Sequence, residues 1–351
     1  MDNTLDHKCP KCDASLKFNP KSQSWICEYC KSEFNIDDLI KYENSTNKIL
    51  NKISDKVNIK TYTCKNCGAE VMVDENTSAT SCIYCKNTVI LKNKLQDEFN
   101  PDYVIPFKNT KEDAITAFKN LRKGRILIPK EFISEKNISE MSGIYIPFWL
   151  YNYNASGEIE AICENEREWS DSEYEYKEVE TYNETRKGNM KFKYIPVDGS
   201  VKFQNDIMNS IEPYNYDDLK NFNYSYLSGF LAQKYDVSLK EAEIDASKRA
   251  TNTFISVLKS DIHFYDSVSV INHNIELKKT NSYYCLLPVW MLNIKYKDKI
   301  YTFAMNGQTG KLIGNIPIDV KKAIFLWVGI TFSITIILFL FILLGELIWL
   351  K

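Results

Sequence analysis

The most constraining feature is an apolar run at residues 323–345, which holds 23 consecutive residues without a charged side chain. As an α-helix this run would be about 34 Å long, enough to cross a hydrocarbon core of about 30 Å. A core helix of a soluble domain usually has a polar face, and a signal peptide lies at the other end of a chain. The sequence therefore predicts one C-terminal transmembrane helix at 323–345.

The charges that flank this run predict its orientation. Lys321 and Lys322 precede it, whereas Glu346 and Lys351 follow it. Because cytoplasmic flanks carry the excess of Lys and Arg, the N-terminal bulk is expected in the cytoplasm. The chain is thus expected to be a single-pass, tail-anchored protein whose first partner is the lipid bilayer.

The cysteine count matters because of this predicted location. The 351 residues contain ten cysteines, and a reducing compartment favours metal binding over disulfides. Eight of them form one pattern used twice: two C-x-x-C pairs separated by fourteen residues. The first quartet is Cys9, Cys12, Cys27 and Cys30, and the second is Cys64, Cys67, Cys82 and Cys85.

Four thiolates at this spacing are the ligands of a closed, tetrahedral zinc site. We predict two structural Zn²⁺ ions in two zinc ribbons, residues 1–38 and 61–95, joined by a polar helical linker at 39–60. Each ribbon is too small to fold by apolar burial alone, so metal would supply its folding free energy. A thioredoxin-like redox centre is the alternative for the C-x-x-C pairs, and His7 is an alternative ligand.

The local charge does not favour nucleic acid as a partner. Residues 1–38 carry five Lys against seven acidic residues, and residues 60–94 carry five Lys against three. Neither segment has the basic surface that phosphate contacts require. Protein contact is therefore the expected role of the ribbons, with a simple spacer as the alternative.

The remainder of the chain predicts two units in which a helix precedes an antiparallel meander, at 100–163 and 233–318. Each unit contains a Pro-x-Trp motif near the start of a strand, Pro147 to Trp149 and Pro288 to Trp290. The recurrence suggests a duplication, and the order of elements is similar to cystatin-like or PepSY-like modules. The fold class is therefore α+β multidomain: two zinc ribbons, two such units and one transmembrane helix.

Local signals place the elements within these units. Thr110 and Ser238 are expected helix N-caps, and Gly124 is expected to close the first helix. The second unit is expected to turn at 297–299 and again at 306–310, where a strand turn explains Gly307 to Lys311 better than a phosphate loop does.

Between the units, residues 164–232 predict an acidic β-hairpin and a connecting segment. Residues 164–186 hold nine acidic residues against three basic ones, and Lys187-Gly188-Asn189 is expected to turn the chain. An edge protected by charge is one interpretation of this hairpin, and a docking surface for a basic partner is the other. Cys163 and Cys285 are expected in the core, and His263 and His273 are expected at the surface or in the core.

Five segments together resemble a bacterial family of membrane proteins with N-terminal zinc ribbons and one C-terminal transmembrane helix. Members are often labelled as transcription-factor-like, or even as replication-restart helicases, although this chain lacks nucleotide-binding loops. The genes of the family tend to lie near membrane-stress genes, which implies a recruitment role at the inner face of the bacterial cell membrane. The segments are IPFWLY (146–151), IPVDGS (195–200), residues 210–237, LLPVWMLN (286–293) and FAMNGQTGKLIG (303–314).

The expected function is therefore that of a non-enzymatic, zinc-binding scaffold that recruits membrane-associated proteins. No catalytic residue and no small-molecule substrate are predicted. A membrane-tethered nucleic-acid or transcription factor is the second hypothesis, and an enzyme or ligand binder that uses a pocket in the α+β units is the third.

Overall fold

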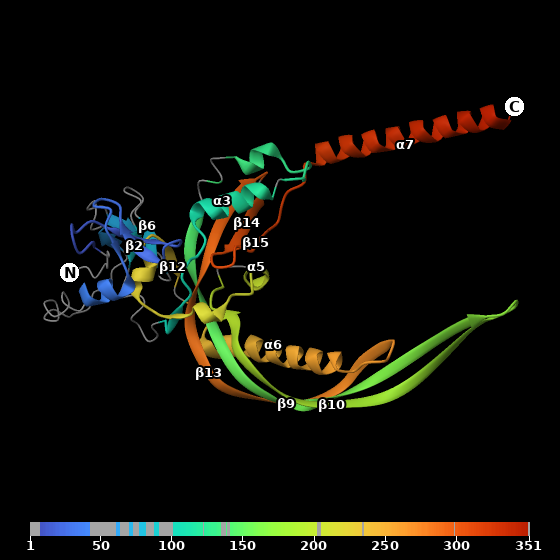
Figure 1. Ribbon diagram of the computed structural model, residues 1–351, viewed down its shortest axis with the longest axis horizontal. Coiled ribbons are helices and arrows are strands. Elements are labelled where there is room, and N and C mark those ends of the chain that lie inside the picture. The colour runs from blue at the N-terminus through green and yellow to red at the C-terminus, as the bar shows by residue number, and fades with distance from the viewer. Residues whose placement is uncertain are drawn as a thin grey trace.

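The protein is described from a computed structural model. It describes residues 8–42, 61–63, 70–72, 77–81, 88–90, 101–121, 123–134, 138, 141–201, 205–233, 235–297 and 299–349. The fold is mixed α and β, with one large sheet, an N-terminal cysteine cluster and one apolar C-terminal helix. Figure 1 shows a compact part, which we call the body, and two parts that project from it: a long curved arm of β-strands and the C-terminal helix.

The elements follow in chain order. The strands are β1 (Leu16–Asn19), β2 (Ser24–Cys27), β3 (Glu33–Phe34), β4 (Thr61–Thr63), β5 (Glu70–Met72), β6 (Thr77–Ser81), β7 (Thr88–Ile90), β8 (Tyr103–Val104), β9 (Ser142–Ser170), β10 (Glu175–Asp198), β11 (Lys220–Asn221), β12 (Leu231–Gln233), β13 (Ser267–Tyr296), β14 (Lys299–Asn306) and β15 (Leu312–Gly314). The helices whose bounds lie within the described residues are α3 (Lys111–Asn120), α5 (Asn205–Ser210), α6 (Leu239–Ser260) and α7 (Val320–Trp349), with 3₁₀ turns η1 (Lys130–Ile133), η2 (Tyr216–Asp218) and η3 (Tyr224–Leu227). Residues 36–42 are also helical.

The large sheet brings distant parts of the chain together. Its strand order is β11-β8-β13-β9-β12-β6-β7, with β10 paired to β9 and β14 paired to β13. The central pair, β9 with β13, is antiparallel and extends from Ser142 opposite Met291 to Glu164 opposite Ser267. β9 runs without interruption across the predicted boundary at 163/164.

Two short strands join the predicted units within this sheet: β8 lies in the first unit, and β12 lies at the end of the predicted connecting segment 164–232. β8 pairs in parallel with β13, and β12 pairs in parallel with β9. Each Pro-x-Trp motif then reaches the other unit's helix. Trp149 Nε1 donates to the carbonyl of Val237 (2.9 Å), and Trp290 Nε1 donates to the carbonyl of Asn109 (3.0 Å). Both carbonyls lie immediately before a helix N-cap.

A second pair of matched contacts lies beside the first. Gly199 donates its N–H to the carbonyl of Pro147, and Gly307 donates to the carbonyl of Pro288, each at 2.8 Å. The Gly199 carbonyl accepts from the two residues before the N-cap of α6, and the Gly307 carbonyl accepts from the two before the N-cap of α3. The two Pro-x-Trp motifs therefore make corresponding contacts.

Both predicted helix starts are confirmed, whereas one predicted end is wrong. Thr110 and Ser238 each form a capping box, with Asp113 and Glu241 respectively. α3 ends at Asn120, so Gly124 does not close it, although Gly124 does adopt a positive φ of 77° in the following turn.

The predicted turn at Lys187-Gly188-Asn189 is also wrong, because β10 continues through it and pairs with β9. The hairpin turns instead between Ser170 and Glu175. A Cβ on Gly188 would lie 2.8 Å from Leu258 of α6, so this glycine permits close helix packing rather than a turn. Gly157, which pairs with Gly188, would similarly meet the carbonyl oxygen of Asn274 at 2.3 Å.

The arm consists of β9, β10 and β13, and α6 lies along its concave side (Figure 1). Small side chains on that side, such as Ala155 and Ala161, let Phe254 and Leu258 of α6 pack against the sheet. Burial of these apolar side chains is what holds the arm to the helix.

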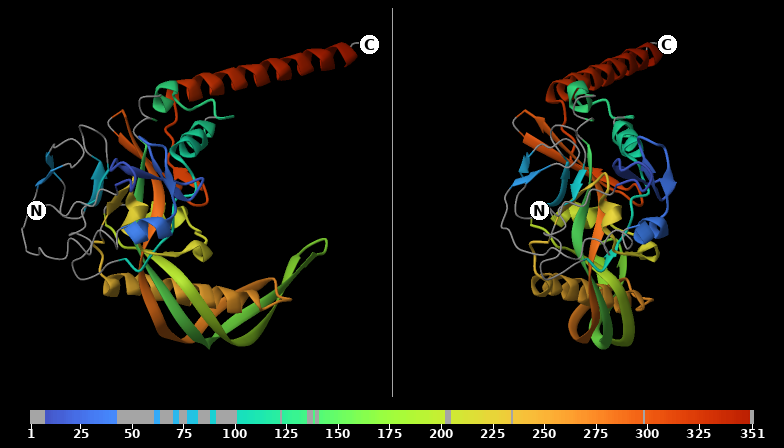
Figure 2. Two further views of the ribbon diagram at one scale, coloured as in Figure 1. Left: turned by 60° about the vertical axis from the view of Figure 1, so that its left-hand side comes forward. Right: turned by 90° about the vertical axis from the view of Figure 1, so that its left-hand side faces the viewer.

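α7 contains the whole predicted transmembrane span, residues 323–345. It begins three residues before that span, at Val320, and ends at Trp349. Val320–Phe339 is long and apolar enough to cross a membrane, and none of it is buried. Its base is fixed to the body: Asp319 N–H donates to the Leu127 carbonyl (2.8 Å), and Lys322 Nζ donates to the Ile128 carbonyl (3.2 Å). Figure 2 shows the helix leaving the body alone from two further directions.

Candidate metal centre

Two similar turns present the first cysteine quartet. In the first, Cys9 N–H donates to Ala14 and Asp13 N–H donates back to the Cys9 carbonyl, at 2.7 and 2.9 Å. In the second, Cys27 N–H donates to Ser32 and Lys31 N–H donates back to the Cys27 carbonyl, both at 2.9 Å. Asp13 and Lys31, each directly after the second cysteine of its pair, have φ values of 63° and 58°.

These turns bring four sulfur atoms together. Cys9 Sγ lies 3.5 Å from Cys30 Sγ, and Cys12 Sγ lies 3.5 Å from Cys27 Sγ. All four lie within 4.8 Å of one another. A tetrahedral zinc site with bonds of about 2.3 Å separates its sulfurs by about 3.8 Å, whereas a disulfide would need about 2.05 Å. The cluster therefore has the dimensions of a four-thiolate metal site.

Burial and hydrogen bonds shift the thiols of the cluster in different directions. Burial raises the pKa of Cys9. A hydrogen bond with the backbone of Ala14 lowers the pKa of Cys12, but burial and the neighbouring sulfurs together outweigh it and raise that pKa to about 12. Lys11 N–H donates to Cys9 Sγ (3.4 Å), and Cys30 N–H donates to Cys27 Sγ (3.5 Å). Hydrogen bonds with the side chain and backbone of Ser32 lower the pKa of Cys30 to about 6. Cys30 is thus available as a ligand at neutral pH.

The second quartet lies outside the described residues, as does His7. The described strands end directly before its two pairs: β4 ends one residue before Cys64, and β6 ends one residue before Cys82. β6 pairs with β12, which joins this segment to the large sheet. The ligand role of Cys64, Cys67, Cys82 and Cys85 stays a prediction.

The segment that carries the first cysteine cluster packs against the body of the protein. Trp25 is only 1% exposed and donates from Nε1 to the carbonyl of Ser225 (2.7 Å). Phe18 packs edge-on against Tyr226, with ring centroids 5.7 Å apart. Lys21 forms an ion pair with Asp113 in the first turn of α3 (2.5 Å), which holds the pKa of that carboxyl below its usual value. The segment around the cluster is therefore part of the main core.

The sequence of one curated protein matches that of this chain over nearly its whole length. The chain is 35% identical over 318 residues to the uncharacterized protein YdjG of Bacillus subtilis (strain 168), and the match covers 91% of this chain and 92% of YdjG. The chain belongs to the YdjG family. No family model and no solved structure matches it. The predicted resemblance to a bacterial family is thus shown, whereas the zinc-ribbon character and the labels expected of that family stay predictions.

In this member of the YdjG family, Trp25 is the main anchor between the cysteine cluster and the body. Trp25→Ala is expected to lower the free energy of unfolding by about 3–5 kcal/mol, because it leaves a cavity in the core and removes one of the two hydrogen bonds that the Ser225 carbonyl accepts, the other coming from the Ser228 N–H. Urea denaturation of the chain in detergent measures this loss. Tyr29→Ala, on the same segment but 82% exposed, is the control and should cost less than about 0.5 kcal/mol. Equal losses would contradict the anchoring role.

The remaining cysteines and histidines lie where the sequence analysis expects them. Cys163 and Cys285 are fully buried, and His263 and His273 are exposed. Burial raises the pKa of both thiols, Cys285 most strongly, so neither is a reactive thiolate.

Sequence reasoning missed the site around Asp198, which corresponds to Asn306 in the second unit. Both side chains accept a hydrogen bond from the backbone N–H two residues later, in Ser200 and Gln308. Asn306 also donates to the carbonyls of Ile211 and Pro213. Among the described residues, Asp198 Oδ2 is buried without a hydrogen-bond partner. The sequence signal that could have identified this site is the pair of dipeptides Asp198-Gly199 and Asn306-Gly307.

Burial raises the pKa of Asp198 to about 7. A carboxyl with an unfolded pKa of about 3.9 then binds more protons when folded, so the free energy of unfolding should fall as pH rises from about 4 to about 7. Asp198→Asn should flatten this dependence and raise stability at pH 8 by up to about 4 kcal/mol. Urea denaturation at pH 5 and pH 8 checks this. An equal gain at both pH values would show that Asp198 is not the group responsible.

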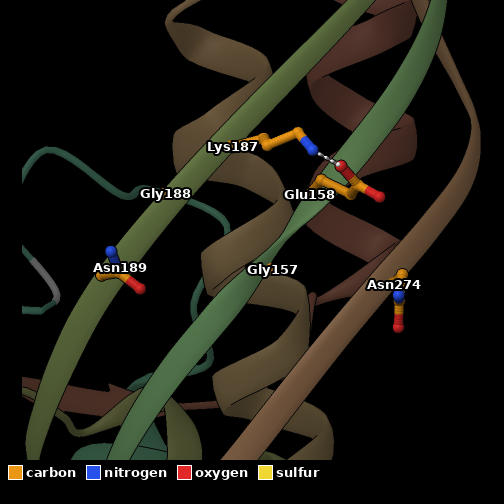
Figure 3. Close-up of a pocket in the computed structure, with 6 residues that line it drawn as sticks. All are labelled: Gly157, Glu158, Lys187, Gly188, Asn189 and Asn274. Carbon is orange, nitrogen blue, oxygen red and sulfur yellow. Dashed lines mark ion pairs between the residues drawn. The ribbon is translucent and has the colours of Figure 1, made fainter.

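Two open depressions lie on the described surface of the arm. One is lined by Asn154, Ala155, Ser156, Asn189, Met190, Lys191, Glu276 and Lys278. The other is lined by Gly157, Glu158, Lys187, Gly188, Asn189 and Asn274. Figure 3 shows it on the side of the strands away from α6. Glu158 and Lys187 pair with each other across it at 2.7 Å. The depression is open because two glycines face each other, and its charged groups are already paired.

Proposed function

We propose that the chain is a non-enzymatic, membrane-tethered scaffold that recruits protein partners at the cytoplasmic face of a bacterial cell membrane. The observation that carries this proposal is the combination of a closed cysteine cluster, built into the body, with an apolar helix that none of the body covers. A surface of that size and apolarity needs lipid or protein around it.

The metal is proposed to be zinc, as two structural ions in two ribbons. The four sulfurs of the first cluster match a tetrahedral site without an open position for substrate or water. The identical spacing in the second quartet supports a second ion there. A closed site contributes folding free energy rather than catalysis, which supports a structural role for both.

Lys321 and Lys322 at the base of α7 support an orientation with the body in the cytoplasm. In this orientation the thiolates stay reduced and able to bind metal. The matched contacts of Trp149 and Trp290 support an internal duplication of the two α+β units, and the arm takes strands from both, since β9 pairs with β13 along it. A role in the membrane-stress response stays a prediction.

Recruitment is tested by affinity purification of the full chain from membranes in mild detergent. Cys64→Ser with Cys67→Ser should reduce the recovery of specific partners at least several-fold, because the second ribbon would lose its metal. Cys163→Ala, a buried cysteine outside both quartets, is the control. Unchanged recovery by the double variant, with normal membrane association, would discard the recruiting role of that ribbon.

A further inference from the structure

The distal end of the β-arm extends beyond the helix that covers the rest of it. α6 ends at Ser260, and the residues after it still cover the strands as far as Tyr182, whose ring lies 5.5 Å from that of Tyr265. Beyond this point β9 and β10 continue as a two-stranded hairpin over residues 165–180. We call these residues the distal hairpin.

The side of the distal hairpin that continues the α6-covered face is aromatic. Trp169 stacks on Tyr176 with ring centroids 5.5 Å apart and planes 10° apart, and Tyr174 lies 6.3 Å from Tyr176. Arg167 lies over the Trp169 ring at 5.6 Å. Trp169, Tyr174 and Tyr176 are 46%, 63% and 40% exposed. Tyr174 is tilted by 58° to Tyr176, so the three rings form an exposed aromatic surface that only Arg167 covers in part among the described residues.

The same segment is strongly acidic. Residues 164–182 hold eight acidic residues (Glu164, Glu166, Glu168, Asp171, Glu173, Glu175, Glu178 and Glu180) and two basic ones (Arg167 and Lys177). The net charge is therefore 2 − 8 = −6. Lys177 forms ion pairs with Glu166 (2.6 Å) and Glu168 (3.7 Å), and its single charge offsets one of these acids. A surface with this charge attracts cations and is repelled by anionic lipid.

Aromatic rings beside carboxylates fit a segment rich in Lys and Arg, because ammonium and guanidinium groups bind both carboxylates and ring faces. We propose that the distal hairpin is a docking site for a basic, amphipathic segment of another protein. Such a segment would lie along the aromatic surface, in line with α6, and place its charges against the carboxylates on both sides.

The charge and the rings of the distal hairpin, rather than its position, identify the partner. Figures 1 and 2 show the distal hairpin and α7 projecting from the body toward the same side, and in Figure 1 the hairpin reaches far along the length of α7. The hairpin therefore does not stop at a membrane surface at the base of α7. The partner is a protein that docks through a segment rich in Lys and Arg.

The test uses the full chain in detergent and a fluorescent 18-residue amphipathic peptide of Lys and Leu as the probe, with binding followed by anisotropy. Glu173→Gln, Glu178→Gln and Glu180→Gln together should weaken binding about tenfold. The matched control removes the same charge elsewhere on the arm and α6, through Glu160→Gln, Asp245→Asn and Glu276→Gln, and should weaken binding less than about twofold. Equal weakening by the two triple variants would overturn the proposal.

The aromatic surface is tested separately. Trp169→Ala should weaken peptide binding about fivefold or more, and Trp169→Phe should restore most of it. Failure of the wild-type chain to bind the peptide, or binding of anionic phospholipid vesicles that depends on Trp169, would also overturn the proposal. Membrane fractionation of the same variants measures separately whether α7 anchors the chain in the membrane. Loss of membrane anchoring and loss of peptide binding therefore give different results.

Discussion

Loss of the metal from the first cysteine cluster is expected to destabilise the body of the protein as well as the cluster. Cys27→Ser with Cys30→Ser removes two of the four ligands, and structural zinc sites contribute about 10–16 kcal/mol of binding free energy to folding. Because Trp25 and Phe18 pack into the main core, the segment would expose apolar side chains when it unfolds. The variant should bind one metal ion fewer and show a much lower unfolding midpoint.

Metal content and denaturant unfolding of the chain in detergent measure both effects. Cys163→Ala removes a buried thiol outside the cluster and is expected to keep the metal content and to cost no more than about 1–2 kcal/mol. Removal of the metal from the wild-type protein by a chelator should lower the unfolding midpoint as the double serine substitution does. Unfolding midpoints that do not respond to the loss of metal would refute a structural role for the cluster.

Charges placed in the middle of α7 are expected to release the chain from the membrane. Ile334→Lys with Ile337→Lys puts two ammonium groups at the centre of the apolar stretch, each at a cost of about 2.5–3.5 kcal/mol. Their sum, about 5–7 kcal/mol, corresponds to a shift of more than a thousandfold in the insertion equilibrium. Most of the double variant should therefore appear in the soluble fraction, or aggregated, after carbonate extraction.

Ile318→Lys is the matched control, because Ile318 is 63% exposed and lies just before α7. This variant should remain in the membrane fraction, since an added lysine there strengthens the cytoplasmic flank. A wild-type chain that carbonate extracts as readily as the double variant would show that α7 does not span the bilayer.

The local features of the fold were predictable because their signals are short. The capping residues Thr110 and Ser238 and the span of α7 follow from a few adjacent side chains. The first cysteine cluster followed from spacing alone, since C-x-x-C turns bring their ligands close before any tertiary contact forms.

Non-local pairing was not predictable from the same patterns. Gly188 has the neighbours of a turn residue, but its pairing with Gly157 and its contact with Leu258 depend on strands far apart in the sequence. The hairpin turn at 171–174 lies instead among polar residues whose turn is stabilised by Asp171, which accepts from the N–H groups of Glu173 and Tyr174. A glycine in the sequence therefore does not by itself predict a turn, because it can instead allow a helix to pack closely against a strand.

The pairing of β8 with β13 and of β12 with β9 also escaped prediction, because strands of two or three residues carry almost no periodic signal. The recurrence of Pro-x-Trp was visible, but the carbonyls that Trp149 and Trp290 reach could be identified only from the structure. The same holds for Trp25, whose Ser225 partner lies 200 residues away.

The central claim is that a metal-bound cytoplasmic body is held at the membrane by α7. The most direct measurement is the zinc content of the full chain, purified in mild detergent from carbonate-washed membranes. The account predicts about two zinc ions per chain, bound by thiolates that a membrane-impermeant reagent cannot label in intact cells. A membrane-extracted chain without zinc, or one whose cysteines that reagent labels from outside, would contradict it.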